Sequence, residues 1–297
     1  MPAILSAGFD IVDPMSSEAA IEVVGLRKAY GDHQAVAGVD LRVDKGEVFA
    51  LLGPNGAGKT TTVEILEGYR RRDAGEVSVL GVDPAKADAA WRARIGIVLQ
   101  STNQFDNLRV GEVVRLFAGY YPDAEDPAVV VERVGLTAKA GAAVHTLSGG
   151  QRRRLDVALG IIGRPELLFL DEPTTGFDPQ ARREFWGLVR NLAAAGTTIL
   201  LTTHYLDEAE ELADRVGVIT AGQVVEVATP AELGGRSQAA ATVSWVEPDG
   251  PRSAQTDTPT AFVRQLVSRF GGAEIPGLSV TRPTLEEIYL KMIGEER

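Results

Sequence analysis

One segment of the chain limits the possible folds more than any other: a glycine-rich turn between an apolar strand and a helix. The turn is Gly53-Pro54-Asn55-Gly56-Ala57-Gly58-Lys59-Thr60, which follows the apolar run Val48–Leu52 and precedes a helical pattern at Thr61–Glu67. Glycines have no side chains, so backbone N–H groups can close on phosphate oxygens, and the helix start adds partial positive charge. This arrangement predicts an α/β fold that binds a nucleoside triphosphate.

Two side chains of the turn have predicted roles of their own. Lys59 can reach the β- and γ-phosphates as a point charge, and the Thr60 hydroxyl can ligate Mg²⁺. A strand–turn–helix connection with a merely solvated lysine is the alternative, and both flanking segments argue against it. Thr61, at the start of the helix, completes the predicted nucleotide contact.

Composition sets wider limits. With 297 residues, 44% of them hydrophobic, the chain can form one or two globular domains. A formal net charge of −11 argues against nonspecific binding to nucleic acid, which depends on Lys and Arg. The absence of cysteine excludes disulfides, thiolate zinc sites and thiol catalysis. No apolar stretch approaches the roughly 20 residues that cross a bilayer, and the amino terminus lacks a signal-peptide pattern.

Changes of pattern along the chain predict four parts. Residues 1–18 are typical of a poorly ordered tail, 19–230 of a nucleotide-binding domain, 231–239 of a linker and 240–297 of a small C-terminal domain. In the C-terminal part we expect two strands and two helices, near 241–246, 278–281, 260–270 and 284–293.

The nucleotide-binding part has its own internal order. Short strands over 21–52 predict an antiparallel sheet, and helical patterns dominate from about 85 to 162, which predicts a helical insertion. Strands near 167–170, 198–201 and 216–220 alternate with helices. This alternation is typical of a parallel α/β core.

A second motif lies at the start of an amphipathic helix. Ser148-Gly149-Gly150-Gln151 precedes apolar residues with helical spacing at Leu155, Ala158, Leu159 and Ile162. Exposed N–H groups at a helix start favour an anion, so the motif predicts a second phosphate contact. An ordinary helix cap is the alternative. The next residues, Arg152-Arg153-Arg154, are predicted to form a solvated or ion-paired helix face.

Two acidic residues end the next apolar strand. Leu167-Leu168-Phe169-Leu170 leads into Asp171 and Glu172, at the carboxyl edge where ligands of open α/β sheets bind. Asp171 is predicted to hold Mg²⁺ through water, and Glu172 to orient or deprotonate the attacking water. The alternative is that the two acidic residues merely form a solvated turn. The phosphate-binding turn favours the catalytic interpretation, because it supplies these residues with a substrate.

Together these motifs resemble the ATP-binding cassette (ABC) family over roughly residues 20–230. The resemblance implies a P-loop NTPase core with an antiparallel β subdomain, a helical insertion and a small C-terminal α+β extension. It also implies four site residues: Tyr30 stacked on adenine, Gln100 in contact with Mg²⁺ and water, Asp178 between two nucleotide sites, and His204 on the γ-phosphate. Phe177 stands where the family usually has Leu, which conserves apolar character before Asp178.

The resemblance further implies a head-to-tail dimer that holds two ATP molecules. Each ATP would be clamped between Gly53–Thr61 of one subunit and Ser148–Gln151 of the other. The expected Mg²⁺ ligands are Thr60, Gln100 and Asp171, and the expected catalytic residues are Glu172, His204 and Gln100.

A separate integral-membrane permease is the other implied partner, with this chain at the cytoplasmic face of the cell membrane. Phe105, Leu108 and Phe117 are apolar candidates for that contact, although Phe117 also suits the core. Residues 283–290 are similar to the tail of cassettes serving multidrug and antibiotic exporters of the daunorubicin-resistance type. The alternative is an amphipathic terminal helix that packs on the dimer.

A different function is a soluble ABC ATPase that acts on nucleic acid or ribosomes. Such a protein would usually show a second cassette, a long coiled coil or a basic arm, and the sequence shows none of them. A noncatalytic regulatory cassette would be expected to lose the base or the lysine. Glu172 and Lys59 are both present, which favours activity.

Overall fold

A six-stranded sheet forms the centre of the computed structural model, which describes residues 18–98 and 105–294. Its strand order is β5-β6-β7-β3-β8-β9. The strands are β5 (Ile95–Val98), β6 (Leu167–Asp171), β7 (Thr198–Thr203), β3 (Val48–Leu52), β8 (Arg215–Thr220) and β9 (Gln223–Ala228). All neighbours are parallel except β8 and β9. The predicted parallel α/β core is confirmed. The predicted tail and Gln100 fall outside the described residues.

Strand β3 shows why these apolar runs become central strands. All five residues are buried, and successive side chains point to opposite faces of the sheet. Phe49 and Leu51 enter a core shared with the antiparallel subdomain, whereas Ala50 and Leu52 enter a core shared with the helices. A parallel sheet covered on both faces requires such continuous apolar sequence.

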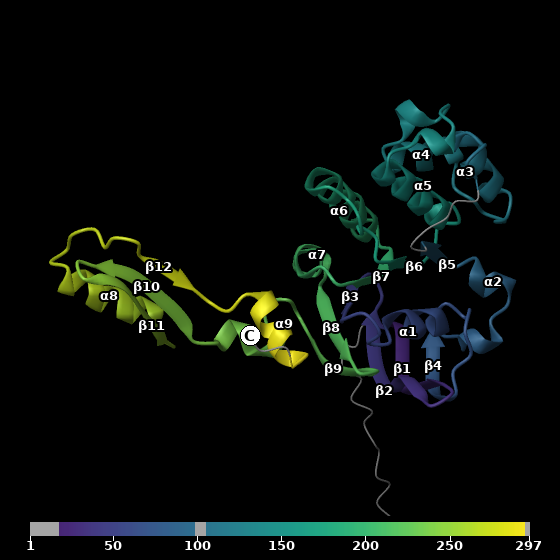
Figure 1. Cartoon of the computed structure of the whole chain (residues 1–297). Helices are drawn as coiled ribbons and strands as arrows, with labels where there is room; N and C mark the ends of the chain where they lie inside the picture. Colours follow the sequence, from purple (N-terminus) through teal and green to yellow (C-terminus); the bar gives the residue numbers. More distant parts are fainter. Residues whose placement is uncertain (1–17, 99–104, 295–297) are drawn as a thin grey trace, which may run out of the picture.

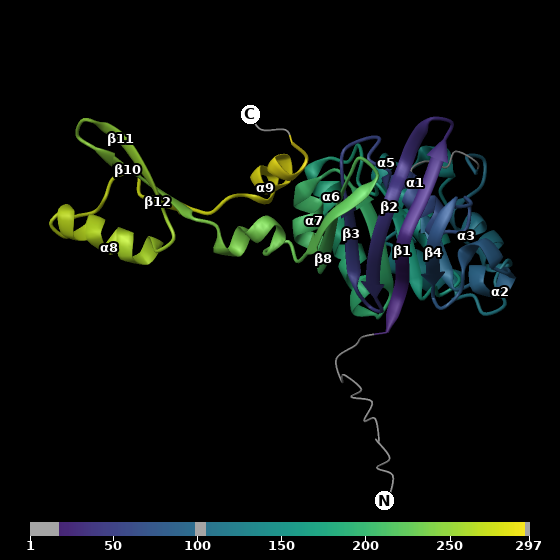
Figure 2. The same ribbon diagram turned by 90° about the horizontal axis from the view of Figure 1, so that it is seen from below.

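Helices α1 (Lys59–Leu66), α6 (Pro179–Ala194) and α7 (Leu206–Leu212) follow the strands β3, β6 and β7, and α5 (Gly149–Ile161) precedes β6. A three-stranded antiparallel sheet, ordered β2-β1-β4, packs on the other side. It contains β1 (Ala19–Tyr30), β2 (His33–Asp44) and β4 (Ala74–Val79), drawn in purple and blue in Figures 1 and 2. The predicted antiparallel subdomain is therefore present.

The helical insertion gathers at one side of the sheet, where α3 (Val110–Ala118) and α4 (Pro127–Arg133) lie beside α5 (Figure 1). It is narrower than the predicted range of 85–162, because β5 within that range joins the central sheet. Gly96 allows this, since a Cβ atom there would lie 2.3 Å from the backbone oxygen of Gly160 on α5. Short elements fill the rest: η1 (Pro84–Lys86), α2 (Ala89–Arg92), η2 (Thr137–Lys139) and η3 (Val144–Thr146).

The C-terminal part forms a small unit that projects from the cassette (Figures 1 and 2). Its sheet, ordered β11-β10-β12, carries one helix and a separate core around Val243 and Trp245. The elements are β10 (Ala241–Glu247), β11 (Gly250–Thr256), α8 (Pro259–Arg269) and β12 (Ser279–Thr281). Strand β11 was not predicted, because it is a mostly exposed edge strand without apolar alternation.

Both ends of this unit are attached to the cassette, which differs from the predicted division at 231–239 and 240–297. The segment η4 (Leu233–Gln238) begins with a fully buried leucine. Helix α9 (Leu285–Met292) returns to pack on η4 and α7, and its Leu285 and Tyr289 join the large core of the cassette. Within the described ranges, no helix combines the length and apolar character needed to span a membrane.

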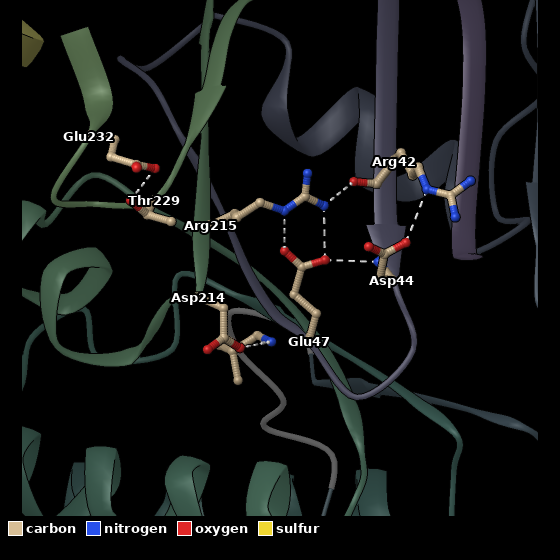
Figure 3. Close-up of polar contacts among 8 residues, drawn as sticks. Arg42, Asp44, Glu47, Asp214, Arg215, Thr229 and Glu232 are labelled. Atoms are coloured by element: carbon tan, nitrogen blue, oxygen red, sulfur yellow. Dashed lines mark hydrogen bonds and ion pairs between the residues drawn. The ribbon is translucent and has the colours of Figure 1, made fainter. Parts of the chain in front are cut away.

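A partly buried ion pair fixes the amino end of β3 (Figure 3). Arg215 on β8 donates to both carboxylate oxygens of Glu47, over 2.7 and 2.9 Å, and to the backbone oxygen of Arg42 over 2.8 Å. The same carboxylate accepts from the backbone N–H of Asp44 at 2.8 Å. These contacts join the antiparallel subdomain to the central sheet at the end opposite the phosphate-binding turn.

Candidate active site

The glycines of the turn are required by close approaches of the backbone. Gly58 has φ of +104°, and a Cβ atom there would lie 2.4 Å from the backbone oxygen of Ala35. A Cβ atom at Gly53 would lie 2.4 Å from the backbone oxygen of Ile219. The turn therefore keeps its shape only with glycine at both positions.

Lys59 is only 5% exposed, and its ammonium lies inside this turn. It donates to the backbone oxygens of Gly53, at 2.7 Å, and Pro54, at 3.1 Å. Burial lowers the pKa of Lys59, whereas the charges of Glu172 and Asp171 act in the opposite direction. The lysine is thus held at the turn by carbonyls that a phosphate can replace.

A cavity of about 260 Å³ adjoins the turn. Its lining comprises Tyr30, His33, Ala35, Asn55, Gly56, Gly58, Lys59, Thr60, Thr61 and Glu172. The structure therefore brings Tyr30 and Glu172 to the phosphate-binding turn. His33 also lines the cavity. The guanidinium of Arg70 lies 5.3 Å from the centre of the Tyr30 ring, a further contact that sequence did not reveal.

The two acidic residues lie at the end of β6, beside β7. The hydroxyl of Thr202 donates to Asp171 Oδ1 at 2.5 Å, and the backbone N–H of Glu172 contacts both the hydroxyl and the carbonyl oxygen of Thr202 at 3.1 Å. His204 Nδ1 lies 3.3 Å from Glu172 Oε1. A buried threonine that the sequence motifs did not identify thus holds Asp171 and Glu172, and Glu172 in turn lies beside His204.

The serine motif occupies the amino end of α5. Ser148 Oγ accepts from the backbone N–H of Gln151 at 3.3 Å, and the Gln151 side chain accepts from the backbone N–H of Ser148. Asp178 caps α6 in the same way, accepting from the N–H groups of Gln180 and Ala181. Both caps are exposed, and neither lines the cavity at Lys59.

The three arginines after this motif differ in their surroundings. Arg152 pairs with Asp106 at 2.7 Å, and Arg154 pairs with Glu184. Arg153 is only 5% exposed and donates to backbone oxygens beside Glu172. The prediction of a solvated face is wrong for Arg153, because its position on α5 faces the end of β6.

Two buried carboxyl groups near the site were also missed. Burial, with smaller contributions from Asp171 and Glu64, raises the pKa of Glu67 to about 8. Burial also raises the pKa of Glu208 on α7, whose carboxylate accepts from the Trp186 indole at 3.3 Å. Their only signal in the sequence is an acidic residue within an apolar helical pattern.

The residues present suit a magnesium ion. Mg²⁺ prefers hard oxygen ligands and binds through one or two protein groups together with substrate phosphates and water. Thr60 supplies an exposed hydroxyl in the first turn of α1, and Asp171 supplies a carboxylate at the end of β6, which β7 separates from β3. These two residues would hold the ion, which would neutralise phosphate charge when bound.

The turn, the acidic strand end and the capped helix together define a nucleotide-binding ATPase of the cassette type. The sequence profile of the ABC transporter family matches residues 36–175. The chain belongs to the ABC transporter family, and it is an ATPase that binds ATP. ATPase subunits of this family act as dimers with a membrane permease in transporter complexes.

Individual relatives agree with this assignment. The chain is 39% identical to the daunorubicin resistance ATP-binding protein DrrA3 of Streptomyces coeruleorubidus, over 95% of this chain and 98% of that protein. It is 38% identical to the Nod factor export ATP-binding protein I of Ralstonia nicotianae, over 95% of this chain and 96% of that protein. A solved ATP-binding subunit of an ABC transporter has the same fold, with a TM-score of 0.68 and 23% identity over 92% of this chain and 99% of that one.

Proposed function

We propose that this chain hydrolyses ATP in sites shared between two subunits and powers a separate permease that exports a drug, antibiotic or lipid-like compound. One observation is the main support for this proposal. The cavity at Lys59 collects Tyr30 and Glu172 but not the exposed cap at Ser148. An exposed helix start that lies outside the Lys59 cavity of its own chain is suited to the nucleotide of a partner.

Each site residue then has a role. Tyr30 stacks on adenine, Lys59 neutralises the β- and γ-phosphates, and Thr60, Asp171 and Gln100 hold Mg²⁺. Glu172 is the general base for the attacking water, because its carboxylate lies at the cavity and beside His204. His204 contacts the γ-phosphate. Asp178, with Ser148–Gln151, reaches the partner's site.

The permease contact is proposed to lie on the helical insertion. Leu108 is 36% exposed, whereas Phe105 and Phe117 pack edge to face with ring centres 5.4 Å apart and are partly buried. Leu116 and Tyr120 are more exposed, at 45% and 70%, and extend the apolar surface beside them. A permease holding this surface would place the chain at the cytoplasmic face of the membrane. The export function rests on the drug resistance and export proteins named among its relatives.

A cross-linking experiment tests the shared site, since the native chain contains no cysteine. Two versions of the Glu172→Gln variant are prepared, one with Ser148→Cys and the other with Asn55→Cys, and then mixed. We expect a disulfide between the two chains with ATP and Mg²⁺, and much less with ADP. The pair lacking either cysteine is the control. A disulfide that forms equally without nucleotide would contradict the proposal.

A second experiment tests transport. The chain is purified with its membrane partner, the partner is identified, and both are reconstituted in vesicles. We expect substrate movement that requires ATP and is lost with Glu172→Gln. Substrate movement that persists in this variant would overturn the coupling of hydrolysis to transport.

A further inference from the structure

The guanidinium of Arg153 joins two segments that the proposed function places in different nucleotide sites. Arg153 lies on α5, the helix that begins at the Ser148 cap. Its Nη2 donates to the backbone oxygen of Asp171 at 2.7 Å, and its Nε donates to that of Pro173 at 3.1 Å. These two carbonyls belong to the residues on either side of Glu172, so one side chain holds the backbone around the general base.

The backbone at Glu172 needs such support. Its φ is +42°, in the left-handed region that is strained for a residue with a side chain. A strained conformation persists only where the surrounding structure over-determines it. Thr202 holds the Glu172 N–H from β7, and Arg153 holds the flanking carbonyls from α5. The direction of the Glu172 side chain therefore depends on both neighbours.

The charge environment also sets Arg153 apart from its neighbours. Arg152 and Arg154 form partly exposed ion pairs, whereas burial lowers the pKa of Arg153 and the charges of Asp156, Asp171 and Glu208 oppose that shift. A buried ion pair is often no more stable than an apolar replacement of similar volume. Fold stability alone therefore does not account for a guanidinium at this position.

We propose that Arg153 is a positioning residue that couples the Ser148 end of α5 to the carboxylate of Glu172 in the same subunit. The inference rests on the proposed function, in which Ser148 contacts the ATP bound in the partner's turn. When α5 shifts on binding that ATP, the guanidinium of Arg153 shifts too. The peptide units around Glu172 then move with it. Occupancy of one site thus sets the geometry of the base in the other.

Three variants test this coupling. Arg153→Met removes all donors while keeping similar length, Arg153→Lys keeps the charge and reaches one carbonyl at a time, and Arg154→Met removes a cation from the same helix as the matched control. For each we measure kcat, KM and the Hill coefficient of ATP hydrolysis, ATP binding to the isolated subunit by calorimetry, and the melting temperature.

For Arg153→Met we expect kcat to fall about 10- to 100-fold, because small misplacement of a catalytic group has effects of this size. The affinity of the isolated subunit for ATP stays unchanged, the Hill coefficient approaches 1, and Arg153→Lys recovers part of kcat. Arg154→Met behaves as the native chain. The inference is overturned if Arg153→Met matches Arg154→Met in kcat and Hill coefficient. It is also overturned if the fraction of activity that Arg153→Met loses equals the fraction of folded protein that it loses.

The ATP-dependent disulfide between Ser148→Cys and Asn55→Cys separates failure of this inference from failure of the proposed function. We expect the disulfide to form with Arg153→Met added to the Glu172→Gln background. If it forms and Arg153→Met has native kinetics, only the role of Arg153 is wrong. If the disulfide does not form even with Arg153 present, the proposal of a shared site is wrong, and so is the proposed coupling.

Discussion

The imidazole Nδ1 of His204 lies 3.3 Å from a carboxylate oxygen of Glu172. The two residues end neighbouring parallel strands, β7 and β6, whose pairing sets Asp171 opposite Thr202. Register in the sheet thus brings the proposed γ-phosphate contact beside the proposed base, whose residue lines the cavity.

His204→Ala should reduce the rate of phosphate release by about 100-fold, because the ring positions the reacting groups. ADP affinity should stay unchanged, since the proposed contact is with the γ-phosphate. Steady-state phosphate release and calorimetry measure the two effects. His145→Ala is the control, because that ring contacts the backbone oxygen of Asp106 instead. Native turnover by His204→Ala would remove His204 from the mechanism.

Gly58→Ala should abolish measurable ATP binding, because the added methyl group would meet the backbone oxygen of Ala35 at 2.4 Å. Gly81→Ala is the matched control, since Gly81 also has positive φ but open space around it. The control should lose roughly 1–2 kcal/mol of stability from strain while it still binds ATP. Calorimetry with ATP and thermal unfolding distinguish the two variants, and equal ATP affinities would argue against a packed turn.

Glu47→Ala should destabilise the chain by about 1–3 kcal/mol, since it removes the carboxylate that pairs with the partly buried Arg215 guanidinium. Arg164→Met provides the comparison, because Arg164 pairs with a highly exposed Asp123 and should show no measurable change. Urea unfolding of both variants gives the difference. Equal midpoints would mean that the contacts in Figure 3 add nothing to stability.

Asp83 should make stability depend on pH below neutrality. The bidentate contact with Arg72 holds the pKa of Asp83 at about 2, below its ordinary value of 3.8. Because the folded-state pKa is depressed, the contribution is fully present above pH 4 and is lost as pH falls towards 2. Asp83→Asn should cost about 1–2 kcal/mol at pH 7, and this deficit should shrink below pH 4.

Denaturant unfolding at pH 7, 5 and 3.5 measures this dependence. Arg72→Met should remove the same pH-dependent contribution, because it deletes the other half of the pair. A deficit of Asp83→Asn that stays constant over this range would assign it to a weaker hydrogen bond from the Ala85 N–H instead.

Local sequence determined the parts of this protein that depend on neighbouring residues. Residues only a few positions apart determine the backbone shape of three features: the glycine turn before Lys59, the cap at Ser148 and the apolar strand ending in Asp171. Their patterns therefore predicted the parallel core and the ABC ATPase assignment, which the fold and the relatives confirm. The roles of the individual site residues stay predictions.

Tertiary structure alone decided which residues meet across the chain. Arg153 is an arginine on the same helix as its ion-paired neighbours Arg152 and Arg154. Only the approach of α5 to β6 buries Arg153 beside Glu172. Likewise, the docking of α9 on α7 separates it from the small unit that precedes it. Such contacts depend on packing between segments distant in sequence, for which periodicity and local propensity carry no signal.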